Sequence, residues 1–131
     1  KGFLKVIDDK TIGFADFRGN LQYISAGNIN ETKKASLILV DYPTRTRLKI
    51  WASTEIIAPA ENPDLLNHLH MEDYGAVVER LIIFNVQSFD WNCPQHIPQR
   101  FTVEEFKKIL PSHPEIVEDC CPELLKQPSS K

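Results

Sequence analysis

Three cations and an indole lie close together in the segment Arg45-Thr46-Arg47-Leu48-Lys49-Ile50-Trp51. Alternate side chains of a strand point to opposite faces, which places Arg45, Arg47, Lys49 and Trp51 on one face. Guanidinium groups bind phosphate oxygens in pairs and also stack on planar rings. This face therefore has the chemistry to hold a phosphate group and a planar aromatic ligand. The alternative is a solvated strand face, on which the cations only discourage edge pairing.

A second polar segment, Asp16 to Asn20, joins an expected strand to an expected helix. Ser25 and Asn28 are three residues apart and so share one face of that helix. Hydrogen-bond donors near the start of a helix favour anions, which makes this junction a candidate anion site. The alternative is that Asn20 caps the helix while Ser25 and Asn28 are only hydrated. The segment has neither a GxGxxG fingerprint nor a P-loop, so dinucleotide and NTPase folds gain no support.

The cysteines and histidines do not form a recognisable catalytic or metal motif. Cys93-Pro94-Gln95-His96 has metal-like spacing, but a zinc site needs a second pair of ligands at suitable spacing. His68 and His70 lie two positions apart on an expected helix, where they point in different directions and are best explained as solvated. We therefore expect neither a metal nor a protein nucleophile.

Hydrophobic periodicity predicts a protein built mainly of paired antiparallel strands. Residues 3–8 and 11–16 alternate around a turn at Asp9-Lys10, and residues 37–41 and 47–55 form a second pair around Tyr42-Pro43-Thr44. Residues 81–89 supply a fifth strand. The expected fold is a small barrel or an α+β sheet domain with peripheral helices.

Three helices have identifiable starts. Residues 20–31 place Leu21, Ile24 and Ile29 on one face, although Gly27 weakens this helix. Asn62-Pro63-Asp64 supplies a cap, a first-turn proline and an acid for a short helix. Thr102-Val103-Glu104-Glu105 is a capping box, whose helix is expected to end at Pro111, and residues 112–115 repeat the same logic.

Composition narrows the class of partner. The chain has 131 residues, 15 Lys and Arg against 18 Asp and Glu, and a net charge of −3, so nucleic acid is not an obvious partner. The cations concentrate in residues 1–53, which therefore suit an anionic ligand better than the rest of the chain does. No apolar run approaches the ~18 residues of a membrane span. Three cysteines cannot all pair within the chain, which favours a reducing, cytoplasmic setting.

Four short motifs are spread over most of residues 2–102. They read Gly2-Phe3-Leu4-Lys5-Val6-Ile7-Asp8, residues 15–28 (ADFRGNLQYISAGN), Asp41-Tyr42-Pro43 with Arg45-Thr46-Arg47-Leu48, and Phe89-Asp90-Trp91-Asn92-Cys93-Pro94-Gln95-His96-Ile97. Together these motifs resemble the pyridoxamine 5′-phosphate oxidase-related FMN-binding family, and their order and spacing make the match specific.

The resemblance implies a flavin split barrel, here a single domain over residues 1–131, that dimerises with FMN in a cleft between two subunits. Family members usually carry a helix and a first strand ahead of the Gly-Phe-Leu motif. This chain begins at Lys1 without them, so we expect the family's N-terminal helix and first strand to be missing.

The same resemblance assigns FMN-binding residues position by position. Lys5 matches a flavin contact, and Ala15 and Asp16 match a strand end whose backbone approaches the ring. The remaining expected contacts lie near the phosphate, along the ring or ribityl chain, or in the partner's half of the site, and they are Asn20, Ser25, Asn28, Arg45, Arg47, Trp91, Asn92 and Arg100. The Arg and His set that binds the pyridoxal substrate in the true oxidases is not matched.

The resulting expectation is an FMN-dependent oxidoreductase that transfers hydride or electrons to or from a small substrate. A cation near the pyrimidine end of the flavin would stabilise its reduced, anionic form. Two other functions fit the sequence. One is a flavin-binding carrier or sensor without catalysis, and the other is a small barrel that binds nucleic acid through its basic face and stacking aromatics.

Overall fold

The computed structural model describes residues 2–72, 74–92 and 95–109. The chain divides into two compact units. The first comprises Lys1–Val40 with Arg47–Cys93 and holds nearly all of the sheet, while the second comprises Asp41–Thr46 with Pro94–Lys131. Each unit is described by itself.

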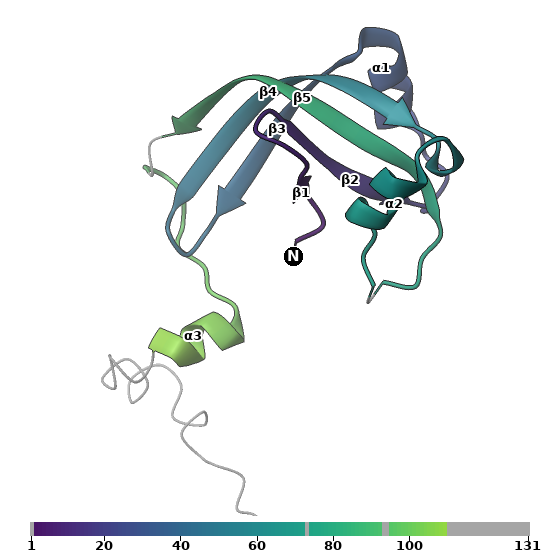
Figure 1. Ribbon diagram of the computed structural model, residues 1–131. Helices are drawn as coiled ribbons and strands as arrows, with labels where there is room; N and C mark the ends of the chain where they lie inside the picture. Colours follow the sequence, from purple (N-terminus) through teal and green to yellow (C-terminus); the bar gives the residue numbers. More distant parts are fainter. Residues whose placement is uncertain (1, 73, 93–94, 110–131) are drawn as a thin grey trace, which may run out of the picture. The chain divides into compact units, whose positions relative to one another are not determined.

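One five-stranded sheet in the order β1-β2-β5-β4-β3 dominates the structure (Figure 1). Its strands are β1 (Lys5–Val6), β2 (Thr11–Phe17), β3 (Lys34–Asp41), β4 (Thr46–Ile57) and β5 (Val78–Asn92). β5 is central and pairs antiparallel with β2 on one side and β4 on the other. The expected strand pairs are therefore confirmed, and the protein is mainly β.

The sheet is open, because β1 and β3 are its two edges. The hairpin of β1 and β2 pairs only Lys5 with Gly13 and Val6 with Ile12, so β1 covers a small part of the outer edge of β2. β5 extends three residues beyond the expected end at Phe89, because the start of β4 continues to pair with it. Trp91 and Asn92 consequently lie on a strand.

The helices begin where side-chain caps act, with one exception. α2 (Pro63–Leu69) begins after Asn62, whose Oδ1 accepts a 3.0 Å hydrogen bond from the Leu65 amide. α3 (Val103–Ile109) begins at the expected capping box, in which Thr102 and Glu105 bond each other's backbone amides.

The exception is α1 (Ile24–Thr32), which begins four residues later than expected. The delay arises because Asn20 accepts a hydrogen bond from the Gln22 amide and Leu21 has a φ of 64°, a left-handed conformation that interrupts a helix. A short 3-10 turn, η1 (Pro59–Glu61), precedes α2. The expected helix over residues 112–115 lies outside the described residues, and among those described no helix is long and apolar enough to span a bilayer.

Two apolar clusters hold the sheet, one on each face. Leu81 and Ile83 of β5 pack with Ala15 and with Leu69 of α2, whereas Ile82 and Phe84 pack with Ala52 on the opposite face. Residues 81–84 form an apolar run in which neighbouring side chains point to opposite faces. Each face of the sheet therefore buries two of them. α2 therefore covers one face of the sheet near its β2 end.

Candidate functional site

The end of the sheet where β4 begins brings together two of the expected flavin contacts. Arg47 of β4 and Asn92 of β5 are paired across the sheet, although 45 positions separate them in the sequence. The Nε of Arg47 and the Oδ1 of Asn92 are both buried and make no hydrogen bond within the described residues. A buried polar group without a partner costs about 1–3 kcal/mol, so such atoms mark places where a ligand gains affinity.

The basic face predicted from the sequence exists on β4, with one correction. Arg47, Lys49 and Trp51 share a face, and Lys49 pairs with Asp90 across the sheet. Arg45 is not part of this strand face, because it lies in the turn before β4 with a φ of 55°. Its amide closes that turn by donating to the Tyr42 carbonyl at 3.2 Å.

Trp91 points to the face opposite to Asn92, since neighbouring residues of a strand alternate. It pairs with Leu48 and is 59% exposed. Trp91 lines a groove of about 320 Å³ together with Val6, Leu48 and Phe89, and Val6 and Phe89 are also largely exposed. These side chains form an exposed apolar band on the sheet face, of the kind that marks an interaction surface.

The other end of the sheet holds Lys5 and Ala15, both expected flavin contacts. The Ala15 side chain is buried in the core, so only its backbone is open to a ligand. The β1–β2 pairing directs the amide and carbonyl of alternate residues Thr11, Gly13, Ala15 and Phe17 toward the outer edge of β2. Because β1 pairs no further than Gly13, the backbone of Ala15 faces a sheet edge that β1 does not cover.

Lys5 lines a polar pocket of about 410 Å³ with His68, His70 and Glu72. His68 is fixed there by its Nε2, which lies 3.2 Å from the Val6 carbonyl oxygen. The sequence interpretation treated both histidines as merely solvated, and their gathering beside Lys5 was not expected. Among the described residues no group of His, Cys, Asp and Glu can hold a metal ion.

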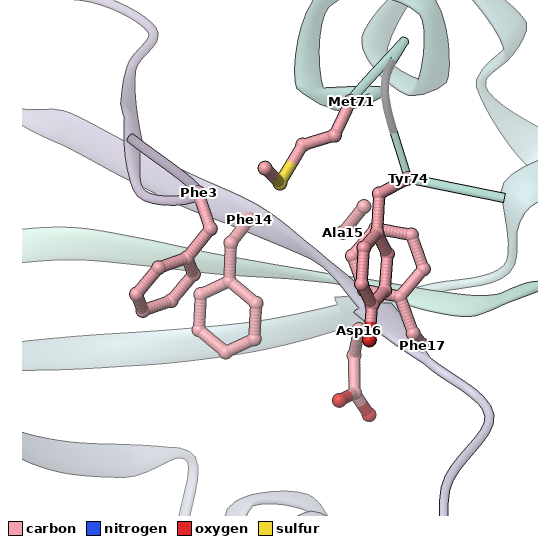
Figure 2. Close-up of a pocket in the computed structure, with 7 residues that line it drawn as sticks. All are labelled: Phe3, Phe14, Ala15, Asp16, Phe17, Met71 and Tyr74. Atoms are coloured by element: carbon pink, nitrogen blue, oxygen red, sulfur yellow. The ribbon is translucent and has the colours of Figure 1, made fainter. Parts of the chain in front are cut away.

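A third cavity, here called the aromatic pocket, lies at the uncovered part of β2 and has a volume of about 360 Å³. Figure 2 shows Phe3 and Phe14 on one flank and Tyr74 with Phe17 on the other. Met71 reaches toward the pocket from the segment after α2, and the Asp16 carboxylate and Ala15 complete the lining. Met71 also lines the polar pocket, so the two cavities are neighbours.

Asp16 belongs to a charged network at the end of β2. Arg80 of β5 donates from Nε to Asp16 Oδ2 at 2.7 Å and from its terminal nitrogen to Glu79 at 2.6 Å. Tyr23 donates its hydroxyl to Glu79 at 3.0 Å, and the Arg80 guanidinium lies 4.6 Å from the centre of the Tyr23 ring. The hydrogen bond to Glu79 raises the pKa of the Tyr23 hydroxyl above its ordinary value of 10.0.

The remaining expected flavin contacts, Asn20, Ser25, Asn28 and Arg100, do not lie at either of these two ends of the sheet. Ser25 and Asn28 lie on α1 with exposed side chains, and Asn20 uses its side chain to bond the Gln22 amide. Arg100 belongs to the second unit, where its guanidinium lies 5.2 Å from the centre of the Tyr42 ring. Cys93 is outside the described residues.

The side chains that sequence reasoning missed are Phe3, Tyr74 and Arg80. Phe3 lies before β1 although its segment alternates as a strand does, Tyr74 lies in the loop before β5, and the pairing of Arg80 with Asp16 joins residues 64 positions apart. The one available signal was the charge of Arg80 directly before the apolar run at residues 81–84, because a cation beside a buried run calls for a nearby carboxylate.

Comparison with known proteins finds no match, whether with a family model, with a curated protein or with a solved structure.

Proposed function

We propose that this protein binds FMN and transfers hydride or electrons through it. The observation that supports this proposal most directly is the unpartnered pair of Arg47 Nε and Asn92 Oδ1. One atom is a donor and the other an acceptor, and the pyrimidine edge of a flavin offers the matching carbonyl and N–H groups. The resemblance to the FMN-binding family points to the same two residues independently.

The chain's own residues would bind and tune the cofactor. Arg47 places a fixed positive charge beside the pyrimidine end of the ring, which favours the reduced, anionic form. Lys5 supplies a second cation at the β1 edge, and the Ala15 backbone offers hydrogen bonds to a polar ring edge. FMN, when bound, supplies the redox chemistry itself.

We further propose that one FMN contacts two copies of the chain, in a homodimer of split barrels. Ala15 pairs with Leu81 and Arg47 pairs with Asn92, so the two groups are eleven positions apart along β5, or about 36 Å of strand. Measured along the strand, this separation exceeds the length of one nucleotide, and two subunits can bring opposite ends of the sheet together at one ligand. The exposed apolar band at Val6, Phe89 and Trp91 offers a surface for that association.

The test is a visible absorption titration of the purified protein with FMN, followed by desalting. We expect flavin bands that remain with the protein, and we expect Arg47→Ala to weaken affinity at least about fivefold, through the lost charge-assisted hydrogen bond. Lys34→Ala, which removes an exposed cation from the edge strand β3, is the matched control and should bind normally. No retained flavin in any version of the protein, or unchanged affinity of Arg47→Ala, contradicts the proposal.

Catalysis is then separated from simple carriage of flavin by adding NADH or NADPH to the flavin-bound protein. Bleaching of the flavin bands, followed by their return in air, supports an oxidoreductase. Flavin that stays oxidised with both reductants supports the carrier or sensor alternative.

A second candidate function rests on the face of β4. Arg47, Lys49 and Trp51 point the same way, and Trp51 is 42% exposed, so cations and a stacking surface are available to a single strand of nucleic acid. The net charge of −3 opposes this function. Binding to a short oligothymidylate that weakens steeply with salt would favour it over flavin.

A further inference from the structure

The aromatic pocket lies at the uncovered edge of β2, where the flavin proposal uses the backbone of Ala15 and assigns no role to the Asp16 carboxylate or to the aromatic side chains. We propose that this pocket binds an organic cation, in which an ammonium group is carried on an aromatic or apolar body. The argument uses the walls of the pocket and the charge at its rim, and it does not depend on FMN.

The walls are two pairs of aromatic rings. Phe3 and Phe14 meet edge to face with ring centres 5.4 Å apart, and Phe17 and Tyr74 do so at 4.7 Å. Figure 2 shows these pairs on opposite flanks of the pocket, with the Met71 side chain directed toward the space between them. A thioether beside aromatic rings is a polarizable and adaptable wall. The resulting surface suits a ring or a short apolar chain.

Aromatic faces carry partial negative charge, so they also attract a cation that lies against them. A pocket with four aromatic side chains offers several such faces around one space. This preference does not extend to a phosphate or carboxylate, which the same faces repel. The walls therefore select an apolar body and favour a positively charged group on it.

The charged groups at the rim of the pocket also favour a cationic ligand. Asp16 and Glu79 share one guanidinium, that of Arg80, at 2.7 and 2.6 Å. The other nearby cation, Arg18, lies 3.9 Å from Glu79 and is 64% exposed, so solvent screens it. The Oδ1 of Asp16 makes no hydrogen bond within the described residues, and the carboxylate lines the pocket. An ammonium group at that oxygen would form a second ion pair with the Asp16 carboxylate.

The protein offers a direct reporter, because Met71 is its single methionine and lines the pocket. Protein prepared with methyl-labelled methionine gives one methyl NMR signal, which we would follow while adding phenethylamine, phenethyl alcohol or hydrocinnamate without FMN. These probes share a phenyl ring and differ in charge. We expect a saturable shift with the amine, at least about fivefold weaker binding of the alcohol, and no saturable shift with the carboxylate.

Two variants locate the interaction. Asp16→Asn should reduce the preference for the amine over the alcohol to near unity, while Asp90→Asn, at an exposed carboxylate on β5, should keep it. Tyr74→Leu removes one aromatic face from an exposed loop residue and should weaken both ligands. Equal binding of all three probes, no shift with the amine, or an unchanged preference in Asp16→Asn overturns the inference.

The result is separable from the flavin proposal. An amine-dependent Met71 shift in protein that retains no FMN keeps this inference and removes the flavin one. Retained FMN with no Met71 shift on adding the amine keeps the flavin proposal and removes this inference.

Discussion

At the scale of single residues, the charged network around Arg80 predicts how the stability of the folded protein changes at alkaline pH. The hydrogen bond from Tyr23 to Glu79 raises the pKa of the Tyr23 hydroxyl above 10.0, so the hydroxyl stabilises the folded state fully below its unfolded pKa. This contribution is lost as the pH rises through the folded pKa. We therefore expect the stability difference between the native chain and Tyr23→Phe to shrink as the pH rises above about 10.

Urea unfolding of both proteins at several pH values from about 8 to about 11 measures this difference. Tyr42→Phe is the control, because the Tyr42 hydroxyl makes no hydrogen bond within the described part of the chain, and its difference from the native chain should not depend on pH in the same way. A Tyr23→Phe difference that grows above pH 10 would show that the Glu79 bond does not hold the proton.

Residue types alone identified part of the candidate site. The alternation of Arg47, Lys49 and Trp51 followed directly from the strand period, and the structure confirms that they share a face. The pairing of Arg47 with Asn92 and of Asp16 with Arg80 did not follow, because strand register depends on the whole sheet. The family resemblance named Arg47 and Asn92 separately, and only the register shows that they lie side by side.

At the scale of elements, β2 and β5 approach each other closely at Gly13 of β2. A Cβ there would lie 2.9 Å from Ile83 Cδ1 and 3.0 Å from the backbone oxygen of Ile82. The backbone atom cannot move without disturbing β5, so Gly13→Ala should destabilise the protein by about 1–3 kcal/mol. Urea unfolding measures the change.

Gly27→Ala is the matched substitution in α1, where a Cβ meets nothing within 4 Å. It should stabilise the protein by about 0.5–1 kcal/mol, because alanine loses less backbone entropy than glycine in a helix. If both variants lose stability equally, steric contact at Gly13 is not the cause.

The elements themselves were largely predictable, whereas their ends were less so. Periodicity found the strands, and the caps at Asn62 and Thr102 began helices where expected. The start of α1 was placed too early, because the left-handed Leu21 has no signal in its residue type. The length of β5 depended on a partner strand, which a local pattern does not contain.

At the scale of the whole molecule, the proposed two-subunit site predicts complementation between defective chains. In the proposed site, one subunit contributes Arg47 and the other contributes Lys5. A homodimer of Arg47→Ala or of Lys5→Ala therefore lacks one of these contacts in both of its sites and should bind FMN weakly. In a mixed dimer, one site carries both defects and the other carries neither. Random pairing of equal amounts therefore restores about a quarter of the native sites.

Co-expression of the two variants with different affinity tags, followed by purification on both tags, gives the mixed dimer alone. We expect one tightly bound FMN in each mixed dimer, measured by flavin absorbance against protein concentration. If the Arg47 and Lys5 contacts belonged to the same subunit, every site in the mixed dimer would carry exactly one defect, and tight binding would not return. Lys5 pairs with Gly13, which pairs with Ile83, so nine positions along β5 separate the Lys5 and Arg47 registers, and we expect the first outcome.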